Sequence, residues 1–160
     1  MAFVPAEFIV PERLETAQFV LRPLMIGDVV KDYDAVMTSV ERLRGVFGPR
    51  TKWPEGLSFE DDLIDLGWHH KEFRRRTSFA YTMMAPDESL CLGCAYIYPS
   101  DLTGYDAVAY CWVRDSHAAA LDRPLFEAFR GWIERDWPFG KVAYPGRSLS
   151  WAEAADLKTT

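Results

Sequence analysis

The sequence predicts an α+β (mixed α/β) fold: a mostly antiparallel sheet flanked by helices, with one β-α-β crossover near the C-terminus. Segment 78–113 contains three short apolar runs separated by turn residues, which is typical of an antiparallel meander. Apolar residues three or four apart before and after this segment predict amphipathic helices. A short apolar run at 141–145 follows the last helix and predicts a right-handed crossover to a parallel strand.

Chain length and composition narrow the class of protein. We expect one domain over residues 1–160, since this length suits a single hydrophobic core. Apolar residues make up 49% of the chain and charged residues 26%, which is typical of a globular protein. The formal net charge of -6 argues against nucleic acid as the main partner, because phosphate binding needs a positive surface.

The expected location follows from segments that the sequence lacks. No apolar stretch approaches the roughly 20 residues that are needed to cross a bilayer, so we expect no membrane partner. The N-terminus has no basic region and contains Pro5 and Pro11, which argues against a signal peptide. Three cysteines are a small, odd number for a disulfide framework. We therefore expect a cytoplasmic protein.

The N-terminal part is expected to form an arm, a strand and a helix. Residues 1–15 predict an extended arm, because prolines oppose a helix there. Residues 18–24 have the composition of a strand. Asp28 is a suitable N-cap for a helix whose apolar positions continue to Val40.

A longer helix is predicted from Phe59 to about Arg76. Ser58 can cap it, and Asp61 occupies the position of a capping box. Acidic residues at its start and arginines at its end complement the helix dipole. We prefer this interpretation of the arginine run to a phosphate site.

The central strands are predicted at 78–85, 90–98 and 106–113. Turn residues at 86–89 and 99–104 separate them, so the three strands are expected to pair in sequence order.

The C-terminal part is expected to form a helix, a strand and a final helical turn. The last long helix follows a break at residues 115–116, with Pro124 in its first turn, and ends at Trp137. Residues 141–145 predict the short parallel strand. The tail from Ser150 predicts one more helical turn.

This order of elements resembles the GCN5-related N-acetyltransferase (GNAT) family, together with three short motifs. Leu21-Arg22-Pro23-Leu24 followed by Gly27-Asp28 is similar to the family's first strand and helix start. Leu92-Gly93, in the second strand of the meander, looks like the family's strand with a hydrophobic residue before glycine, and Tyr110-Cys111-Trp112-Val113 looks like its fourth strand. The resemblance covers residues 18–145. It implies that acetyl-CoA is the co-substrate and that its thioester lies beside the end of the fourth strand.

The resemblance also implies how the cofactor is held. A backbone N–H near Trp112 or Val113 would hold the thioester carbonyl. Members usually continue with a glycine-rich turn that binds the pyrophosphate, but residues 113–124 contain no glycine, which makes this chain a divergent member. Arg114, His117 and Arg123 surround the predicted helix start and are the candidates for binding the anion there. The alternative, ion pairing of these residues with Asp115 and Asp122, is preferred.

Acetyl transfer needs an acid and a base. The resemblance implies a tyrosine as the acid, and Tyr144 is the nearest substitute in position. Asp106 and Asp115 flank the predicted fourth strand and are the candidates for the base. A structural role is the alternative for all three. Trp112 and the loop from Trp53 to Gly56 either form the wall of a substrate pocket or pack in the core or as a lid.

Two other groups of residues point weakly to a metal or redox site. Cys91 and Cys94 form a C-x-x-C pair, but residues three apart on a strand point to opposite faces, so we expect no metal. Asp65 and His69 share a helix face, where a solvated pair is preferred to a catalytic site or a metal site. His70 continues the apolar stripe.

Two functions remain open from the sequence. The first is an N-acetyltransferase that moves acetyl from acetyl-CoA to a small-molecule or peptide amine. The second is a catalytically degenerate ligand-binding or dimerisation module of the same fold. A homodimer is expected in either case, because a short C-terminal part leaves sheet edge or apolar surface uncovered.

Overall fold

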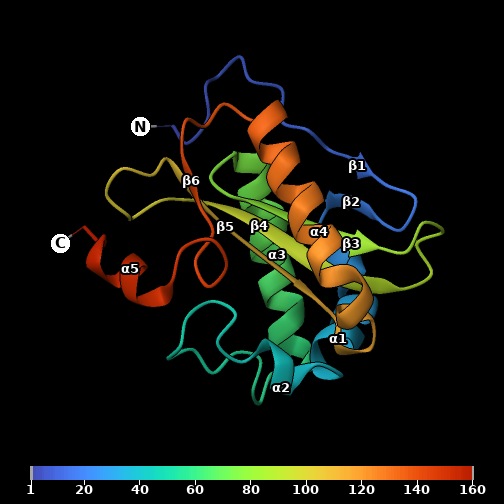
Figure 1. Ribbon diagram of the computed structural model, residues 1–160. Coiled ribbons are helices and arrows are strands. Elements are labelled where there is room, and N and C mark those ends of the chain that lie inside the picture. The colour runs from blue at the N-terminus through green and yellow to red at the C-terminus, as the bar shows by residue number, and fades with distance from the viewer. Residues whose placement is uncertain (1, 160) are drawn as a thin grey trace.

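The computed structural model describes residues 2–159, so Met1 and Thr160, at the ends of the predicted domain, lie outside it (Figure 1). Its sheet has six strands in the order of the sequence. All neighbouring strands are antiparallel except the last pair, which is parallel. The strands are β1 (Leu14–Glu15), β2 (Val20–Pro23), β3 (Phe79–Met84), β4 (Cys91–Pro99), β5 (Ala107–Val113) and β6 (Val142–Ala143). The predicted meander and the parallel crossover are confirmed.

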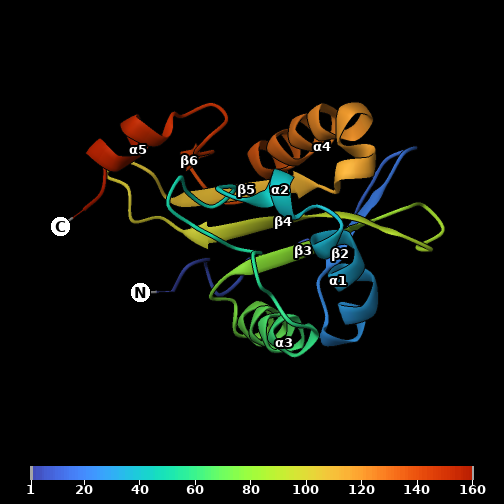
Figure 2. The same ribbon diagram turned by 90° about the horizontal axis from the view of Figure 1, so that it is seen from below.

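Helices cover both faces of this sheet. Figure 2 shows the sheet nearly edge-on, with α4 on one side and α3 on the other. The helices are η1 (Ile26–Asp28), α1 (Val29–Met37), α2 (Val40–Leu43), α3 (Phe59–Arg75), α4 (Asp115–Asp136) and α5 (Trp151–Asp156). Among residues 2–159, none of them is both long enough and apolar enough to span a membrane.

Alternation along the strands creates two hydrophobic cores. Ala95 and Ile97 of β4 belong to the core beneath α4, whereas Tyr96 belongs to the core beneath α1 and α3. On β5, Cys111 faces α4 and Trp112 faces the opposite side. This is the period of two that strands impose, and it decides which side chains reach each face.

The Leu21–Leu24 motif has a structural role. Arg22 donates two hydrogen bonds to the carboxylate of Asp28, at 2.8 and 3.0 Å, and one to Glu88 at 2.6 Å. Asp28 also accepts a hydrogen bond from the Met25 backbone N–H. The motif therefore joins β2 to the start of the helical segment and to the β3–β4 turn.

The helix predicted from Asp28 to Val40 is interrupted. α1 ends at Met37, and Ser39 Oγ donates to the carbonyl of Ala35 at 2.7 Å. The same hydroxyl accepts a hydrogen bond from the backbone N–H of Asp115 at 2.9 Å. The interruption thus places a serine at the N-terminus of α4, a long-range contact that helix periodicity does not reveal.

The expected place of Pro124 was wrong. α4 begins at Asp115, so Pro124 lies inside the helix and not in its first turn. Three alanines, Ala118 to Ala120, favour helix ahead of the proline, and Ser39 supplies a hydrogen bond at the helix start. These features extend the helix on the N-terminal side of Pro124.

The opposite orientation expected for Cys91 and Cys94 was also wrong. The register between β3 and β4 shifts at Met83/Met84, which is a β-bulge. The extra residue turns Cys91 to the same face as Cys94, and both thiols lie in the core beneath α1 and α3. On its other edge β4 approaches β5 closely at Gly93, where an added Cβ would meet the Trp112 carbonyl oxygen at 2.0 Å.

Candidate active site

The parallel pair β5–β6 is short and then opens. Only Ala107 pairs with Val142 and Val108 with Ala143, so β6 is shorter than the predicted strand at 141–145. The chain then turns away at Gly146, whose φ is +80°. Within the described residues, β5 from Ala109 to Val113 has no strand partner on this edge. We call this segment the open edge of β5.

A cavity of about 280 Å³ lies along the open edge, and Arg147 reaches into it. One guanidinium nitrogen of Arg147 donates to the carbonyl of Cys111 at 3.1 Å. The guanidinium also forms a two-pronged ion pair with Asp122, at 2.9 and 3.0 Å. Arg42 lies 3.5 Å from the same carboxylate. Burial raises the pKa of Asp122, but the guanidiniums outweigh it and the net pKa is lowered. The charges of this region therefore compensate one another.

The basic residues at the start of α4 do not converge on one point. Arg114 is buried, and it donates to the carbonyl of Cys91 and to Asp34. The side chain of Arg123 is 87% exposed and pairs with Glu127. His117 is half-buried, and its Nδ1 lies 2.8 Å from the Ser116 hydroxyl. Arg114 and Arg123 do form ion pairs, as the preferred interpretation predicted. Their partners, however, are Asp34 and Glu127 and not the neighbouring aspartates.

Trp112 and Val113 lie on opposite faces of β5. Trp112 faces α1 and α3, where its indole N–H donates to the hydroxyl of Tyr96 at 2.9 Å. Val113 is buried beneath α4. Backbone groups alternate between the two edges of a strand, so those of Val113 point to the open edge as the Cys111 carbonyl does, whereas the Trp112 carbonyl faces Gly93 of β4.

The predicted acid and bases occupy three separate places. Asp106, before β5, accepts hydrogen bonds from the backbone N–H groups of Gly140 and Lys141 at 2.7 and 3.0 Å, which holds the start of β6 against β5. Asp115 lies beyond the other end of β5, in the first turn of α4. Tyr144 follows β6, and its hydroxyl is buried with no hydrogen-bond partner in residues 2–159. Burial raises the pKa of this phenol, so it keeps its proton.

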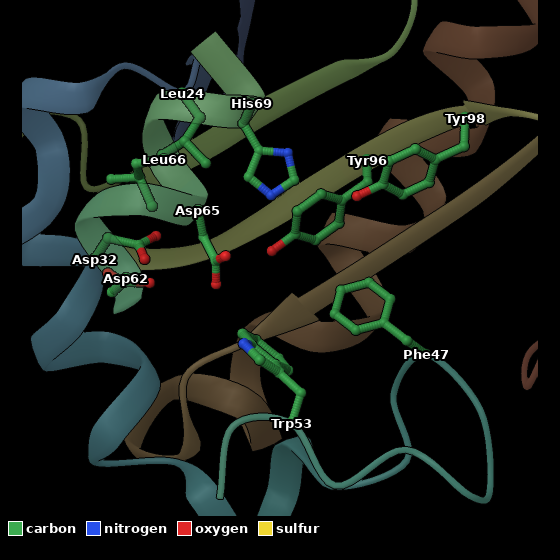
Figure 3. A pocket seen from close by; sticks show the side chains of 10 residues that line it. All are labelled: Leu24, Asp32, Phe47, Trp53, Asp62, Asp65, Leu66, His69, Tyr96 and Tyr98. Atoms are coloured by element: carbon green, nitrogen blue, oxygen red, sulfur yellow. The ribbon is translucent and has the colours of Figure 1, made fainter. Parts of the chain in front are cut away.

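A second cavity, of about 230 Å³, lies on the other side of the sheet between α1, α3 and β4 (Figure 3). We call it the acidic pocket. Its polar groups are carboxylic acids, an imidazole and phenols, and its cover is aromatic. The lining residues are Leu24, Asp32, Phe47, Trp53, Asp62, Asp65, Leu66, His69, Tyr96 and Tyr98.

Helix and strand periods explain why these side chains meet. Asp62, Asp65 and His69 lie three and four residues apart, which is one face of α3. Tyr96 and Tyr98 lie two apart and share a face of β4. Figure 3 shows Asp65, His69 and Tyr96 pointing toward one another across the gap between α3 and β4.

The loop at residues 44–58 brings the aromatic cover. The ring of Phe47 lies 5.2 Å from the ring of Trp53 and 5.2 Å from that of Tyr96. Trp53 in turn lies 6.2 Å from Trp112. Trp53 thus contributes to the wall of the pocket, one of the two roles that the sequence left open for its loop.

The acids of the pocket are buried without a cation. Asp32 is 3% exposed and Asp62 is 2% exposed. Among residues 2–159, no Lys or Arg forms an ion pair with Asp32, Asp62 or Asp65. Burial raises the pKa of all three, for Asp32 with the charge of Asp62 as a further cause. Burial lowers the pKa of His69, so its imidazole is neutral near pH 7.

Sequence reasoning missed most of this pocket. Asp65 and His69 were expected to form a solvated pair, but both line the cavity. His70 accepts a hydrogen bond from the backbone N–H of Ile26 at 3.3 Å. The spacing of Asp62, Asp65 and His69 on one helix face was the available signal. Within residues 2–159, no group of three or more His, Cys, Asp or Glu side chains is arranged to hold a metal ion.

The open edge and the acidic pocket lie close to one another. Tyr96 of β4 is paired with Tyr110 of β5, so the acidic pocket lies one strand away from the open edge. A third cavity, of about 410 Å³, shares Phe47 with the acidic pocket and Trp151 with the cavity at the open edge. The site therefore has two chemically different halves separated by β5.

Comparison with known proteins identifies the fold. The sequence matches no family model and no curated protein. Among solved structures, a protein from Bordetella pertussis assigned to the GnaT family of acetyltransferases is similar, with 15% identity and a TM-score of 0.65 over 86% of this chain and 81% of that one. RimL, a ribosomal L7/L12 alpha-N-protein acetyltransferase in complex with coenzyme A, has 14% identity and a TM-score of 0.63 over 78% and 68%.

A third similar structure is the ribosomal-protein-S5-alanine acetyltransferase from Vibrio fischeri. It has 10% identity and a TM-score of 0.59 over 77% of this chain and 67% of that chain. At such identities the likeness shows the fold alone. The chain has the GCN5-related N-acetyltransferase fold.

Proposed function

We propose that this protein transfers an acetyl group from acetyl-CoA to an amine. The observation that carries the proposal is the open edge of β5, whose unpaired backbone groups lie one strand away from the acidic pocket. An exposed strand edge can bind the amide groups of an extended ligand by backbone hydrogen bonds. An acetyltransferase of similar fold has been solved in complex with coenzyme A, which supports acetyl-CoA as the co-substrate.

In the proposed reaction the amine nitrogen attacks the thioester carbonyl carbon and the carbon–sulfur bond breaks. The proton of the amine passes to a base, and the departing sulfur takes a proton from an acid. His69 is suited to be the base, since its imidazole is neutral and its buried Nδ1 has no partner in residues 2–159. Tyr144 is the proposed acid, because its raised pKa keeps the phenol protonated and the residue follows β6, where the two strands part. Asp106 and Asp115 are the weaker candidates for the base.

The residues fit the thioester end of acetyl-CoA better than its phosphates. Of the two residues that the resemblance implied, Val113 has its backbone groups on the open edge, whereas the Trp112 carbonyl faces β4. The guanidinium of Arg114 is bonded to Asp34 and to the Cys91 carbonyl, so the half-buried His117 and the exposed Arg123 are the candidates for binding the diphosphate. Arg147 must leave the Cys111 carbonyl before an extended ligand can pair there.

The reaction is tested by following the free thiol that coenzyme A gains, with acetyl-CoA and a panel of amines and peptides with free N-termini. We expect amine-dependent thiol release that Tyr144→Phe reduces at least tenfold in kcat, as proton transfer by a positioned acid typically contributes roughly 100-fold or more. Release that is equally fast without any amine would contradict the proposal.

The second candidate is a degenerate module that binds a ligand without catalysis. Two observations favour it: residues 113–124 contain no glycine, and Arg147 occupies the open edge. Acetyl-CoA binding in calorimetry without thiol release for any amine would decide for this candidate.

We also propose that the protein is a homodimer. Ile64 and Trp68 on α3 are 52% and 56% exposed, and Ile26 lies against the same helix at Gly67. Exposed apolar side chains that gather in this way are typical of association surfaces. Light scattering at micromolar concentration should give twice the mass of the chain, and Trp68→Glu should halve it. We place the protein in the cytoplasm, which suits its three free thiols.

A further inference from the structure

We propose that the acidic pocket binds an alkylammonium group, so that the acceptor is a cationic amine and not a neutral or anionic one. This inference rests on the proposed acetyl transfer, because only in that reaction is the bound amine an acceptor. The binding itself is a property of the pocket and can be measured without acetyl-CoA.

The first argument is the uncompensated charge of the pocket. Asp62 is buried, since only 2% of it is exposed, and its Oδ2 has no hydrogen-bond partner in residues 2–159. A buried carboxylate oxygen without a partner is costly, and native structures rarely leave one so. Asp32 and Asp65 line the same 230 Å³ cavity, and within the described residues no side-chain cation pairs with them. A ligand that brings a positive charge and N–H donors would supply what the described chain lacks.

The second argument is the aromatic wall. The rings of Phe47, Trp53, Tyr96 and Tyr98 line the cavity opposite the acids. An ammonium group is attracted to the face of such rings, most strongly to that of tryptophan. Carboxylates on one side and ring faces on the other select a cation with an alkyl chain over a fully hydrated metal ion.

The third argument is size and place. The cavity of about 230 Å³ is below the roughly 300–1,000 Å³ of sites for drug-sized ligands, so it suits one small ammonium group. It lies one strand away from the open edge of β5. An acceptor held here is therefore close to the place proposed for the thioester.

The surrounding groups set how binding depends on pH. The Cys94 thiol donates to Asp32 Oδ1 at 3.5 Å, and the phenols of Tyr96 and Tyr98 have raised pKa values and stay neutral. Neutral His69 does not repel a cation. Glu72 and Asp61 add negative charge along α3. Burial raises the pKa of these acids, a bound cation favours their ionised forms, and the affinity for a cation should therefore rise with pH.

The test is calorimetric titration of the whole protein, without acetyl-CoA, with n-pentylammonium chloride and with 1-pentanol as the neutral isostere. We expect 1-pentanol to bind at least tenfold more weakly. Asp62→Asn should weaken pentylammonium binding by about ten- to a hundredfold, since one charge-assisted contact is lost. Glu60→Gln, an exposed loss of charge on the same helix, is the matched control and should change the affinity less than twofold. Affinity in the wild type should be higher at pH 8 than at pH 6.

Equal binding of pentylammonium and 1-pentanol would overturn the inference, as would equal effects of Asp62→Asn and Glu60→Gln. No binding of pentylammonium at pH 8 would overturn it too. If Asp62→Asn does not fold, Asp65→Asn at a half-buried position provides the same comparison. Pentylammonium binding without any acetyl transfer would support the inference and contradict the proposed reaction. Acetyl transfer to neutral or anionic acceptors without pentylammonium binding would support the proposed reaction and contradict the inference.

Discussion

The two cavities beside β5 differ in how their buried charge is compensated. At the open edge, Asp122 meets the guanidiniums of Arg147 and Arg42, and the chain satisfies its own charges. In the acidic pocket, Asp32 and Asp62 are more deeply buried and have no cation within the described residues. A compensated cavity is stable without a ligand and must be opened before one binds, whereas an uncompensated cavity gains free energy when a cation binds. This contrast can be removed at either cavity by substitution.

The largest expected effect comes from giving the acidic pocket its own cation. Asp65→Lys at a half-buried position places an ammonium beside Asp32 and Asp62, as Arg147 stands beside Asp122. We expect pentylammonium binding to fall by about a hundredfold or more, because one carboxylate is lost and a competing cation is added. The melting temperature should not fall. Calorimetry and thermal unfolding measure the two quantities, and unchanged pentylammonium affinity would contradict the comparison.

The converse change opens the compensated cavity. Arg147→Ala frees the Cys111 carbonyl and leaves Asp122 with Arg42 alone. Pantetheine carries no phosphate, so its affinity reports the freed edge and not lost charge. We expect pantetheine to bind about tenfold more tightly to this variant, since one hydrogen bond to a charged group no longer competes. Arg130→Ala, which removes another α4-side guanidinium outside this cavity, is the control. Weaker binding to Arg147→Ala would show that the guanidinium holds the ligand.

The two regions should respond to pH with opposite signs. The folded pKa of Asp32 is raised, so the native state binds protons that the unfolded state has lost, and stability falls as pH rises above the ordinary aspartate pKa. The folded pKa of Asp122 is lowered, so its contribution is present above that value and is lost as pH falls through the lowered pKa. As the pH rises above the ordinary aspartate pKa, the free energy of unfolding should therefore fall because of Asp32. Over the same range the stabilising contribution of Asp122 should stay constant.

Urea unfolding at pH 5 and pH 8 measures this difference. The wild type should be less stable at pH 8 than at pH 5, and Asp32→Asn should remove this difference. Asp122→Asn should lower stability at both, because Asp122 is ionised throughout this range. A wild type and an Asp32→Asn variant with the same pH dependence would show that Asp32 is ionised over the whole range.

The smallest effect is expected at the exposed start of α4. Arg123→Ala should change the free energy of unfolding by less than about 0.5 kcal/mol, since its pair with Glu127 is on the surface. If Arg123 contributes to the diphosphate site, acetyl-CoA affinity should fall about tenfold while pantetheine affinity stays the same. Equal affinities of wild type and variant for acetyl-CoA would remove Arg123 from the proposed site.

The sequence by itself determined the order of elements in this protein. Local signals were sufficient for the meander over residues 78–113 and for α3, whose capping box at Ser58 and Asp61 is formed as expected. They were also sufficient for the helix after Ser150. Such signals are carried by neighbouring residues, because turn chemistry, caps and apolar periods act over a few positions.

The tertiary structure alone decided the site. Asp32 and Asp62 are 30 positions apart, and Cys111 and Arg147 are 36 apart, so no local pattern links either pair. The bulge that turns Cys91 toward Cys94 depends on pairing with β3, and the start of α4 depends on Ser39. Burial and the presence or absence of a counter-charge are properties of packed neighbours. For this reason the sequence predicted where the strands lie but not which of its acids are left without a cation.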